Sequence, residues 1–374
     1  MPKTVWIIGA GASKSHSGGL FPTADGLLSH LLSRYLANEL PGPEAGLLAL
    51  RDYFRNRLGQ DIKDHQALPD LETVLGFMDS DLEVSQDPAL LLARAFLVRL
   101  VRSALLALHR GQDIGSGEYH SLAGSLSAAD SVITFNWDVL LDNALGREHL
   151  VRPDGTPTYG KATKQYEAFF RRFSGVGAGT FENSSPMGPL SLAAPFDGLF
   201  LKLHGSIDWL ACANPTCDNQ QLVFPLLQDD AQCGLCLERL QSVLVPPVVA
   251  KRVREWAVLR RLWNRAVAEV SAASEIVLWG YSLPAIDFQS RWLLSHAQTG
   301  SLERLTIINP VISGKDSLGS ARHAAFVDSV RRAFGAALVR SSISLFDSFQ
   351  DSRQKVAAEY PSWHELIISQ LRAI

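Results

Sequence analysis

Short apolar runs that alternate with helical segments constrain the fold of this chain most. The runs that we expect to be strands cover residues 5–8, 131–135, 199–203, 275–279 and 305–308. Between them, apolar residues recur at helical spacing, most clearly over 89–109 and 251–272. Strands that alternate with helices predict an α/β fold, with a mostly parallel, doubly wound sheet covered by helices on both faces.

The length of the chain allows two to three domains of ordinary size, but the strands predict one sheet. Of the 374 residues, 47% are hydrophobic and 20% are charged, which is typical of a globular protein with a large core. We expect one α/β domain over residues 1–345 and a C-terminal helical tail over 346–374. Three segments are expected to interrupt that domain. The first is a helical insertion at 22–110. The second is a Gly/Pro/Ser-rich loop at 147–198, which is a candidate lid, and the third is a cysteine-bearing segment at 210–240.

Charge and hydropathy exclude two classes of partner. The net charge is −3, from 35 basic and 38 acidic residues, so direct nucleic-acid binding by bulk electrostatics is not expected. The basic stretch from Lys251 to Arg265 has apolar residues at helical spacing, which predicts an amphipathic helix on the sheet. The richest apolar stretch, 89–109, contains three arginines, and the N-terminus lacks a signal-peptide pattern. We therefore expect a cytoplasmic protein without membrane contact.

Glycine and polar residues follow the first two predicted strands. The run GAGAS at 9–13 is expected to be a glycine-rich turn after the first strand, where phosphate groups contact backbone N–H groups and the positive end of a helix. Because the run lacks the third glycine of GxGxxG, a tight turn that only needs small residues is the alternative. Asn136 and Asp138 follow the second strand. They are candidate ligand-binding residues, but both types are also common helix N-caps, and a helix is expected over residues 137–145.

Candidate residues follow the three later strands as well. His204 comes before a glycine at the end of its strand, and histidine is the usual general base near neutral pH. Gly280 and Ser282 can approach phosphate closely, and Asn309 can bond ribose hydroxyls, although each also fits an ordinary turn. Because the carboxyl ends of parallel strands meet at one edge, we expect these residues to converge in one crevice.

All four cysteines of the chain lie within 25 residues. Cys212 and Cys217 form C-x4-C, Cys233 and Cys236 form C-x2-C, and fifteen residues separate the pairs. Two disulfides would suit a secreted protein, whereas a reducing compartment favours thiolates on a metal. The spacing favours a four-thiolate zinc site, which is structural because it leaves no open position for water.

Taken in order, these motifs resemble those of the sirtuin superfamily, particularly the prokaryotic sirtuin-like effectors of antiphage defence. The matching elements are GAGAS at 9–13, TFNWD at 134–138, KLHGSIDW at 202–209, the four cysteines, GYSLPAID at 280–287 and IINP at 307–310. The resemblance covers residues 4–310. It implies a Rossmann-like, NAD-binding catalytic domain that carries a small four-cysteine zinc ribbon.

The resemblance also implies a role for each matched residue. The residues implied to contact NAD phosphates are Ala10, Gly11 and Ser13, and those implied to bind the adenosine half are Gly280, Ser282 and Asn309. Asn136 would hold the nicotinamide ribose or a water, and Asp138 would hold the nicotinamide amide. His204 would be the general base.

The chain departs from the deacetylating sirtuins at positions that bear on the reaction. The stretch Gly19–Asp25 lacks the Phe-Arg pair whose phenyl ring shields the reacting ribose carbon in those enzymes. Pro246 and Pro247 follow the strand that would form the acyl-peptide groove, and proline cannot donate the main-chain hydrogen bonds that a peptide strand needs. Phe135 replaces the usual glutamine. These departures favour water as the nucleophile.

We therefore predict an NAD glycohydrolase that releases nicotinamide and ADP-ribose, as a regulated NAD-depleting effector of antiphage defence. Regulation is expected through the loop 173–198, through homo-oligomer assembly or through a defence-system partner protein. A protein deacylase and a non-catalytic NAD- or ADP-ribose-binding subunit are the alternatives. A zinc-bearing nucleic-acid module is disfavoured by the acidic balance.

Overall fold

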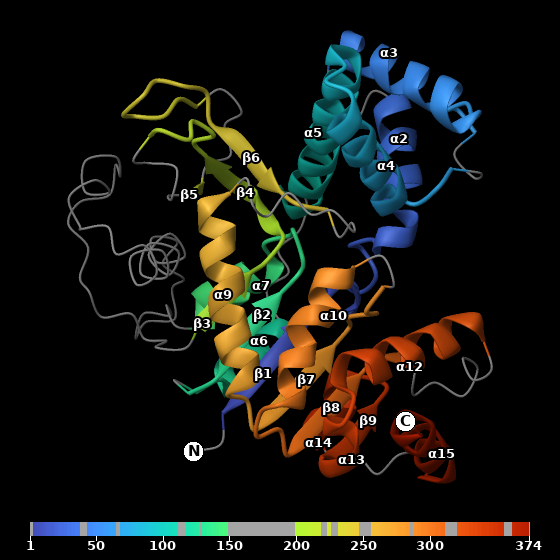
Figure 1. Cartoon of the computed structure of the whole chain (residues 1–374), viewed down its shortest axis with the longest axis vertical. Coiled ribbons are helices and arrows are strands. Elements are labelled where there is room, and N and C mark those ends of the chain that lie inside the picture. The colour runs from blue at the N-terminus through green and yellow to red at the C-terminus, as the bar shows by residue number, and fades with distance from the viewer. Residues whose placement is uncertain are drawn as a thin grey trace.

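Six parallel strands form the central sheet of the computed structural model (Figure 1). In spatial order they are β3 (Leu199–Lys202), β2 (Ser131–Thr134), β1 (Thr4–Ile8), β7 (Glu275–Trp279), β8 (Arg304–Ile308) and β9 (Ser342–Phe346). The chain proceeds outward from β1 to β3 and then returns to the other side of β1 at β7. The border between β1 and β7 is therefore the switch point, where open α/β sheets bind ligands.

The structure describes most of the chain, with gaps. The described ranges are 3–37, 43–64, 68–110, 117–127, 129–148, 199–217, 223–225, 231–246, 256–284, 287–310, 320–354 and 361–373. The predicted lid 173–198 lies outside them, as do residues 149–198 of the predicted loop. Among the helices within these ranges, none has both the length and the hydropathy needed to cross a bilayer.

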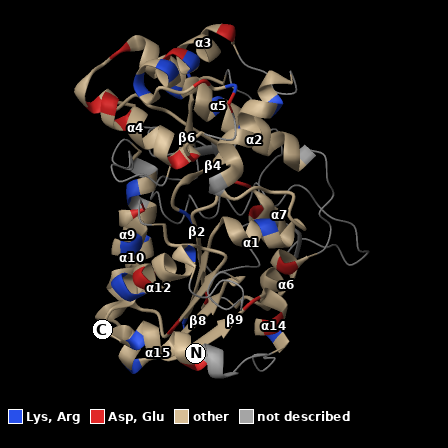
Figure 2. Cartoon of the chain, turned by 90° about the vertical axis from the view of Figure 1, so that its right-hand side faces the viewer, with Lys and Arg blue, Asp and Glu red and all other residues tan. Residues whose placement is uncertain are grey.

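Helices cover both faces of the sheet, as the alternating pattern predicts (Figure 2). Val5 and Ile7 point to one face and Ile8 to the other, and each face has its own apolar core. The first face packs against α9 (Ala257–Ser271), α10 (Phe288–Ser295), α12 (Ala321–Phe334) and α15 (Pro361–Arg372). The second packs against α1 (Ala10–His16), α6 (Glu118–Ser125), α7 (Leu140–Glu148) and α14 (Phe349–Gln354). The doubly wound sheet is confirmed.

A helical block lies beyond the carboxyl ends of the strands (Figure 2). It comprises α2 (Ala24–Leu36), α3 (Glu44–Tyr53) with a π-helical turn at Phe54–Leu58, α4 (Leu71–Val84) and α5 (Pro88–Arg110). The buried Arg102 of α5 donates a 2.6 Å hydrogen bond to the carbonyl of Ile207. This bond connects the block to a second, three-stranded antiparallel sheet of β5 (Val223–Pro225), β4 (Gly205–Ala211) and β6 (Gln241–Leu244).

Three elements differ from the sequence prediction. The helix α1 begins at Ala10, so four residues of GAGAS are helical and only Gly9 precedes the helix. The helix α7 begins at Leu140 rather than Trp137, because the Asp138 carboxylate accepts the N–H of Leu140 at 3.0 Å. The strand β9 was not predicted, since it is a largely exposed edge strand with a weak apolar pattern.

Two helix predictions are confirmed. The predicted long helix at 89–109 corresponds to α5. The amphipathic basic helix corresponds to α9, although residues 251–255 lie outside the described ranges. Its apolar residues Leu259 and Trp263 are buried in the core beneath the sheet, whereas its Arg260 and Arg265 are exposed.

Candidate functional site

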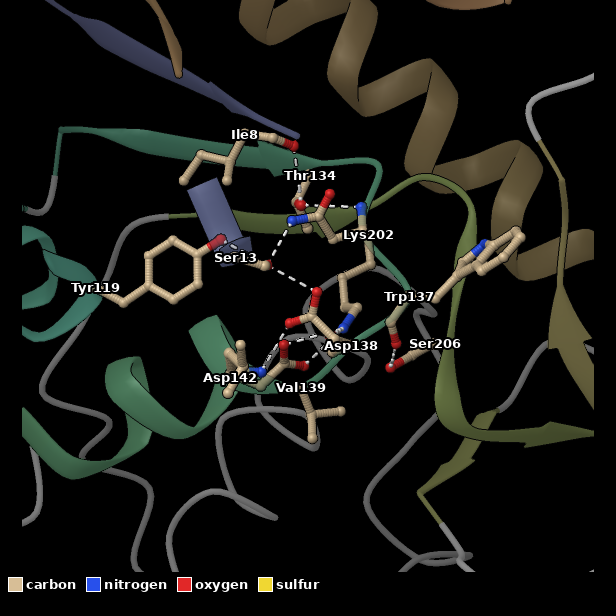
Figure 3. A network of polar contacts seen from close by, with 12 residues as sticks. Ile8, Ser13, Tyr119, Thr134, Trp137, Asp138, Val139, Asp142, Lys202 and Ser206 are labelled. Carbon is tan, nitrogen blue, oxygen red and sulfur yellow. Dashed lines mark hydrogen bonds and ion pairs between the residues drawn. The ribbon is translucent and has the colours of Figure 1, made fainter. Parts of the chain in front are cut away.

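Ser13, Asn136 and Asp138 form one buried, hydrogen-bonded group beyond β1 and β2 (Figure 3). The Asn136 amide donates to the Gly9 carbonyl at 3.0 Å and to the Ser13 hydroxyl at 2.9 Å. The Ser13 hydroxyl in turn donates to Oδ2 of Asp138 at 2.8 Å. Because its single proton is used there, the hydroxyl of Tyr119, 2.9 Å away, must donate to Ser13. Three of the predicted site residues are therefore in direct contact.

A buried ion pair holds the backbone of this group in place. Lys202 of β3 donates from Nζ to the carbonyl oxygen of Asp138 at 2.5 Å and to Oδ2 of Asp142 at 2.9 Å. Both charged side chains are buried. Burial raises the pKa of Asp142 to about 7, and the charge of Lys202 opposes that rise. The position of Asp138 therefore depends on β3 as well as on β2.

His16 lies on the other side of Tyr119. Its Nδ1 accepts the backbone N–H of Tyr119 at 3.4 Å, and the two rings have centroids 4.6 Å apart. Burial and the nearby His120 lower the pKa of His16 to about 4, and the charge of Asp138 opposes this shift. His16 is therefore a neutral acceptor at neutral pH.

His204 lies beyond β3 in a separate, aromatic environment. Its ring is 2% exposed, and Nε2 lies 3.6 Å from Oδ2 of Asp287. Asp287 also accepts the Tyr281 hydroxyl at 2.8 Å. The Phe135 ring has its centroid 5.0 Å from that of His204 and 4.6 Å from that of Tyr281. Phe135 immediately precedes Asn136, so it connects the histidine to the Ser13–Asn136–Asp138 group.

The predicted phosphate-binding glycines contact each other at the switch point. The N–H of Gly11 donates to the carbonyl of Gly280 at 2.8 Å. Gly280 has φ +62, and a Cβ there would lie 2.1 Å from the nitrogen of Ala12. This close approach of two backbones explains why both positions are glycine. The hydrogen bond to Gly280 also means that the Gly11 N–H already has a partner within the protein.

The remaining predicted residues lie at the same edge. Ala10 is half-buried in the first turn of α1, and Ser282 is exposed in the loop after β7. Asn309 is buried at the end of β8, where its backbone N–H donates to the carbonyl of Phe346 at 3.0 Å. At the carboxyl edge the predicted residues thus belong to two polar groups, around Asp138 and around His204, and the Phe135 ring packs against His204.

Sequence reasoning missed three residues of this edge. Tyr119 comes from α6 and carries no local motif that would connect it to Ser13. Lys202 lies in the KLHGSIDW motif, and its pattern indicates only that this residue belongs to a strand. Asp287 ends the quoted GYSLPAID motif, and its place directly before a helix signals an N-cap rather than a partner for histidine.

The four cysteines form a compact cluster at the far end of the small sheet. Their Sγ atoms all lie within 4.8 Å of one another, with 3.5 Å between Cys212 and Cys236 and 3.7 Å between Cys217 and Cys233. Zn–S bonds of about 2.3 Å in a tetrahedron would separate the sulfurs by about 3.8 Å, so the cluster fits a zinc ion. None of the four is in a disulfide. Two of the cysteines follow β4 and the other two lie before β6.

Comparison with known proteins finds likeness at the level of structure. No family model matches the chain, and no curated protein matches it. The chain is similar to solved Sir2 structures over most of its length, as the motifs predict. A Sir2 homologue in complex with NAD shares 14% identity over 98% of this chain and 90% of that one, with a TM-score of 0.38. Sir2Tm bound to a propionylated peptide shares 13% identity over 94% and 90%, with a TM-score of 0.36. A mutant Sir2 homologue in complex with ADP-ribose shares 17% over 91% and 95%, with a TM-score of 0.35.

Proposed function

We propose that this chain binds NAD across the carboxyl edge of the sheet and hydrolyses the bond between nicotinamide and ribose. The observation that carries the proposal is the pair of buried polar groups around Asp138 and around His204, which follow β2 and β3 at the same edge of the sheet. The residues proposed to lie along the dinucleotide are Ala10, Gly11 and Ser13 at the diphosphate and Gly280, Ser282 and Asn309 at the adenosine half. Solved Sir2 structures to which the chain is similar include a complex with NAD and a complex with ADP-ribose.

In the proposed reaction, water attacks the anomeric carbon of the nicotinamide ribose. The bond from that carbon to the ring nitrogen breaks, and its electron pair leaves with neutral nicotinamide. The imidazole of His204 takes one proton from the water, whose oxygen becomes the anomeric hydroxyl of ADP-ribose. General base catalysis of this kind typically contributes ~10²–10⁴ in rate.

Asn136 and Asp138 are oriented for separate tasks. Both N–H donors of the Asn136 amide are used, on Gly9 and Ser13. Its carboxamide oxygen is therefore the atom with which it would accept a proton of the attacking water. Each carboxylate oxygen of Asp138 accepts one hydrogen bond and has a lone pair left over, which suits it to hold the nicotinamide amide.

The test is to incubate the pure protein with NAD, with and without an acylated peptide, and to identify the products. We expect nicotinamide and ADP-ribose in equal amounts without peptide. Nicotinamide release that strictly requires the peptide would instead show a deacylase, and tight binding without turnover would show a regulatory subunit. His204→Ala should slow NAD loss by ~10²–10⁴ while NAD still binds. His296→Ala, at the end of α10, is the matched control and should keep full activity.

We further propose that the activity is regulated, because unregulated hydrolysis would deplete the host cell of NAD. Assembly of several copies, or a defence-system partner protein, is the proposed trigger, and the zinc ion is proposed to be structural. Sedimentation and size-exclusion measurements during turnover test the regulation. A fully active monomer with no added partner would contradict it.

A further inference from the structure

Asp287 makes more contacts than its position in the chain requires. It is the N-cap of α10, and its Oδ1 accepts the N–H of Ser290 at 3.0 Å. That single bond fulfils the capping role. Its second oxygen, Oδ2, takes no part in the cap: it accepts the Tyr281 hydroxyl at 2.8 Å and lies 3.6 Å from Nε2 of His204. The carboxylate is 0% exposed, so this second oxygen has a role inside the protein.

The surroundings strengthen the interaction between this carboxylate and the imidazole. The ring of His204 packs beside those of Phe135 and Trp263, with centroid distances of 5.0 Å and 6.4 Å. The imidazole is 2% exposed, and charges interact more strongly in a buried site than at the surface. A buried carboxylate is stable only when it is hydrogen-bonded or paired. Tyr281 supplies a hydrogen bond, and an imidazolium at position 204 would supply a countercharge.

We propose that Asp287 is the positioning residue of His204. It keeps the proton of the neutral imidazole on Nε2, which leaves the Nδ1 lone pair to take the proton of the attacking water. It then stabilises the imidazolium that forms. The separation of 3.6 Å is longer than a hydrogen bond, and it is within the range over which a carboxylate and an imidazolium attract each other. The catalytic role of Asp287 rests on the proposed function, but its effect on the tautomer of His204 can be measured without any activity.

The test uses the full-length protein with ¹⁵N-labelled histidine. His204→Gln identifies the resonances of position 204 by their loss. The ¹⁵N shifts of the ligand-free wild type should show a protonated Nε2 and an unprotonated Nδ1. In Asp287→Asn the new amide still caps α10, because asparagine is an equally good N-cap. The amide donates an N–H toward the ring, so we expect the proton to move to Nδ1.

A matched control separates capping from positioning. Asp70→Asn makes the same change at the N-cap of α4, where the carboxylate accepts the N–H of Thr73 at 2.7 Å. It should leave both the tautomer and turnover unchanged. Asp287→Asn should lower kcat by ~10²–10⁴ with KM changed only a few-fold, as expected when a base is presented in the wrong tautomer. Tyr281→Phe keeps the carboxylate and should keep the wild-type tautomer.

The outcomes are distinguishable from those of the proposed function. A wild-type imidazole protonated on Nδ1, or a tautomer that is the same in wild type and Asp287→Asn, overturns the inference. If Asp287→Asn fails to fold, the wild-type spectrum alone decides. If the wild-type protein cleaves no NAD, the proposed function fails, while the tautomer still supports or overturns the role of Asp287.

Discussion

The Ser13 hydroxyl donates a 2.8 Å hydrogen bond to Oδ2 of Asp138, although 125 positions separate the two residues in the chain. The bond joins the helix that follows β1 to the loop that follows β2. Since Asn136 and Tyr119 bond the same hydroxyl, one oxygen atom fixes three side chains of the proposed catalytic edge. The geometry of that edge therefore depends on Ser13.

Replacing Ser13 by alanine should destabilise the fold and reduce activity. The change leaves the buried groups of Asn136, Tyr119 and Asp138 without their shared partner, at a cost of about 1–3 kcal/mol in the free energy of unfolding for an unsatisfied group. Urea unfolding and NAD turnover measure the two effects. Ser80→Ala is the control, since that exposed hydroxyl bonds only the carbonyl four residues earlier, and it should cost less than about 0.5 kcal/mol. Equal effects in the two variants would contradict the role of Ser13.

Gly280→Ala should be far more damaging than a comparable glycine substitution elsewhere. Gly59 has φ +66, close to the +62 of Gly280, but a Cβ there meets nothing within 4 Å. Gly59→Ala should therefore lower the free energy of unfolding by only about 1–2 kcal/mol, which is the cost of a left-handed backbone conformation for a residue with a Cβ. At Gly280 the new Cβ would lie 2.1 Å from the nitrogen of Ala12 and would displace α1. We expect loss of NAD binding and a larger fall in the unfolding midpoint. Matching midpoints for the two variants would show that the close approach is not rigid.

Stability should depend on pH through His16. Its pKa is about 4 in the folded protein and 6.5 when unperturbed. Between these values the unfolded chain binds a proton that the folded chain does not, so stability falls as the pH falls from about 6.5 to 4. His16→Gln keeps an acceptor for the Tyr119 N–H and should flatten this part of the profile. Urea unfolding at a series of pH values measures it, with His296→Gln as the control. An unchanged slope in His16→Gln would contradict the assignment.

Metal analysis should find one zinc ion per chain. Cobalt exchanged into the site should give the visible bands of tetrahedral thiolate coordination. Cys233→Ser should lose the metal and unfold the segment around β4 and β6, because binding to such sites is coupled to folding. Because a four-thiolate site is closed, wild-type NAD turnover should not change when cobalt replaces zinc. Less than half an equivalent of metal in freshly purified protein would contradict the site.

The sequence indicated the sheet well because buried parallel strands carry strong apolar runs and end in glycine or polar residues. It failed at β9, where an exposed edge strand needs no continuous apolar run. The turn expected at GAGAS is mostly helix, because small residues suit the first turn of a helix as well as a loop. Contacts such as Tyr119 to Ser13 and Asp287 to His204 depend on tertiary packing between distant elements, which no local pattern encodes. The cysteine cluster was predictable because metal ligands lie close together in the chain.

A crystal structure of the His204→Ala variant with NAD tests the central proposal most directly. The account predicts that the dinucleotide lies across the strand ends, with the anomeric carbon of its nicotinamide ribose facing the Asn136 carboxamide and the space left by the imidazole. Its nicotinamide amide should contact Asp138. A nucleotide bound away from these residues would contradict it, with Asn136 and Asp138 still hydrogen-bonded to Ser13 and far from the ribose.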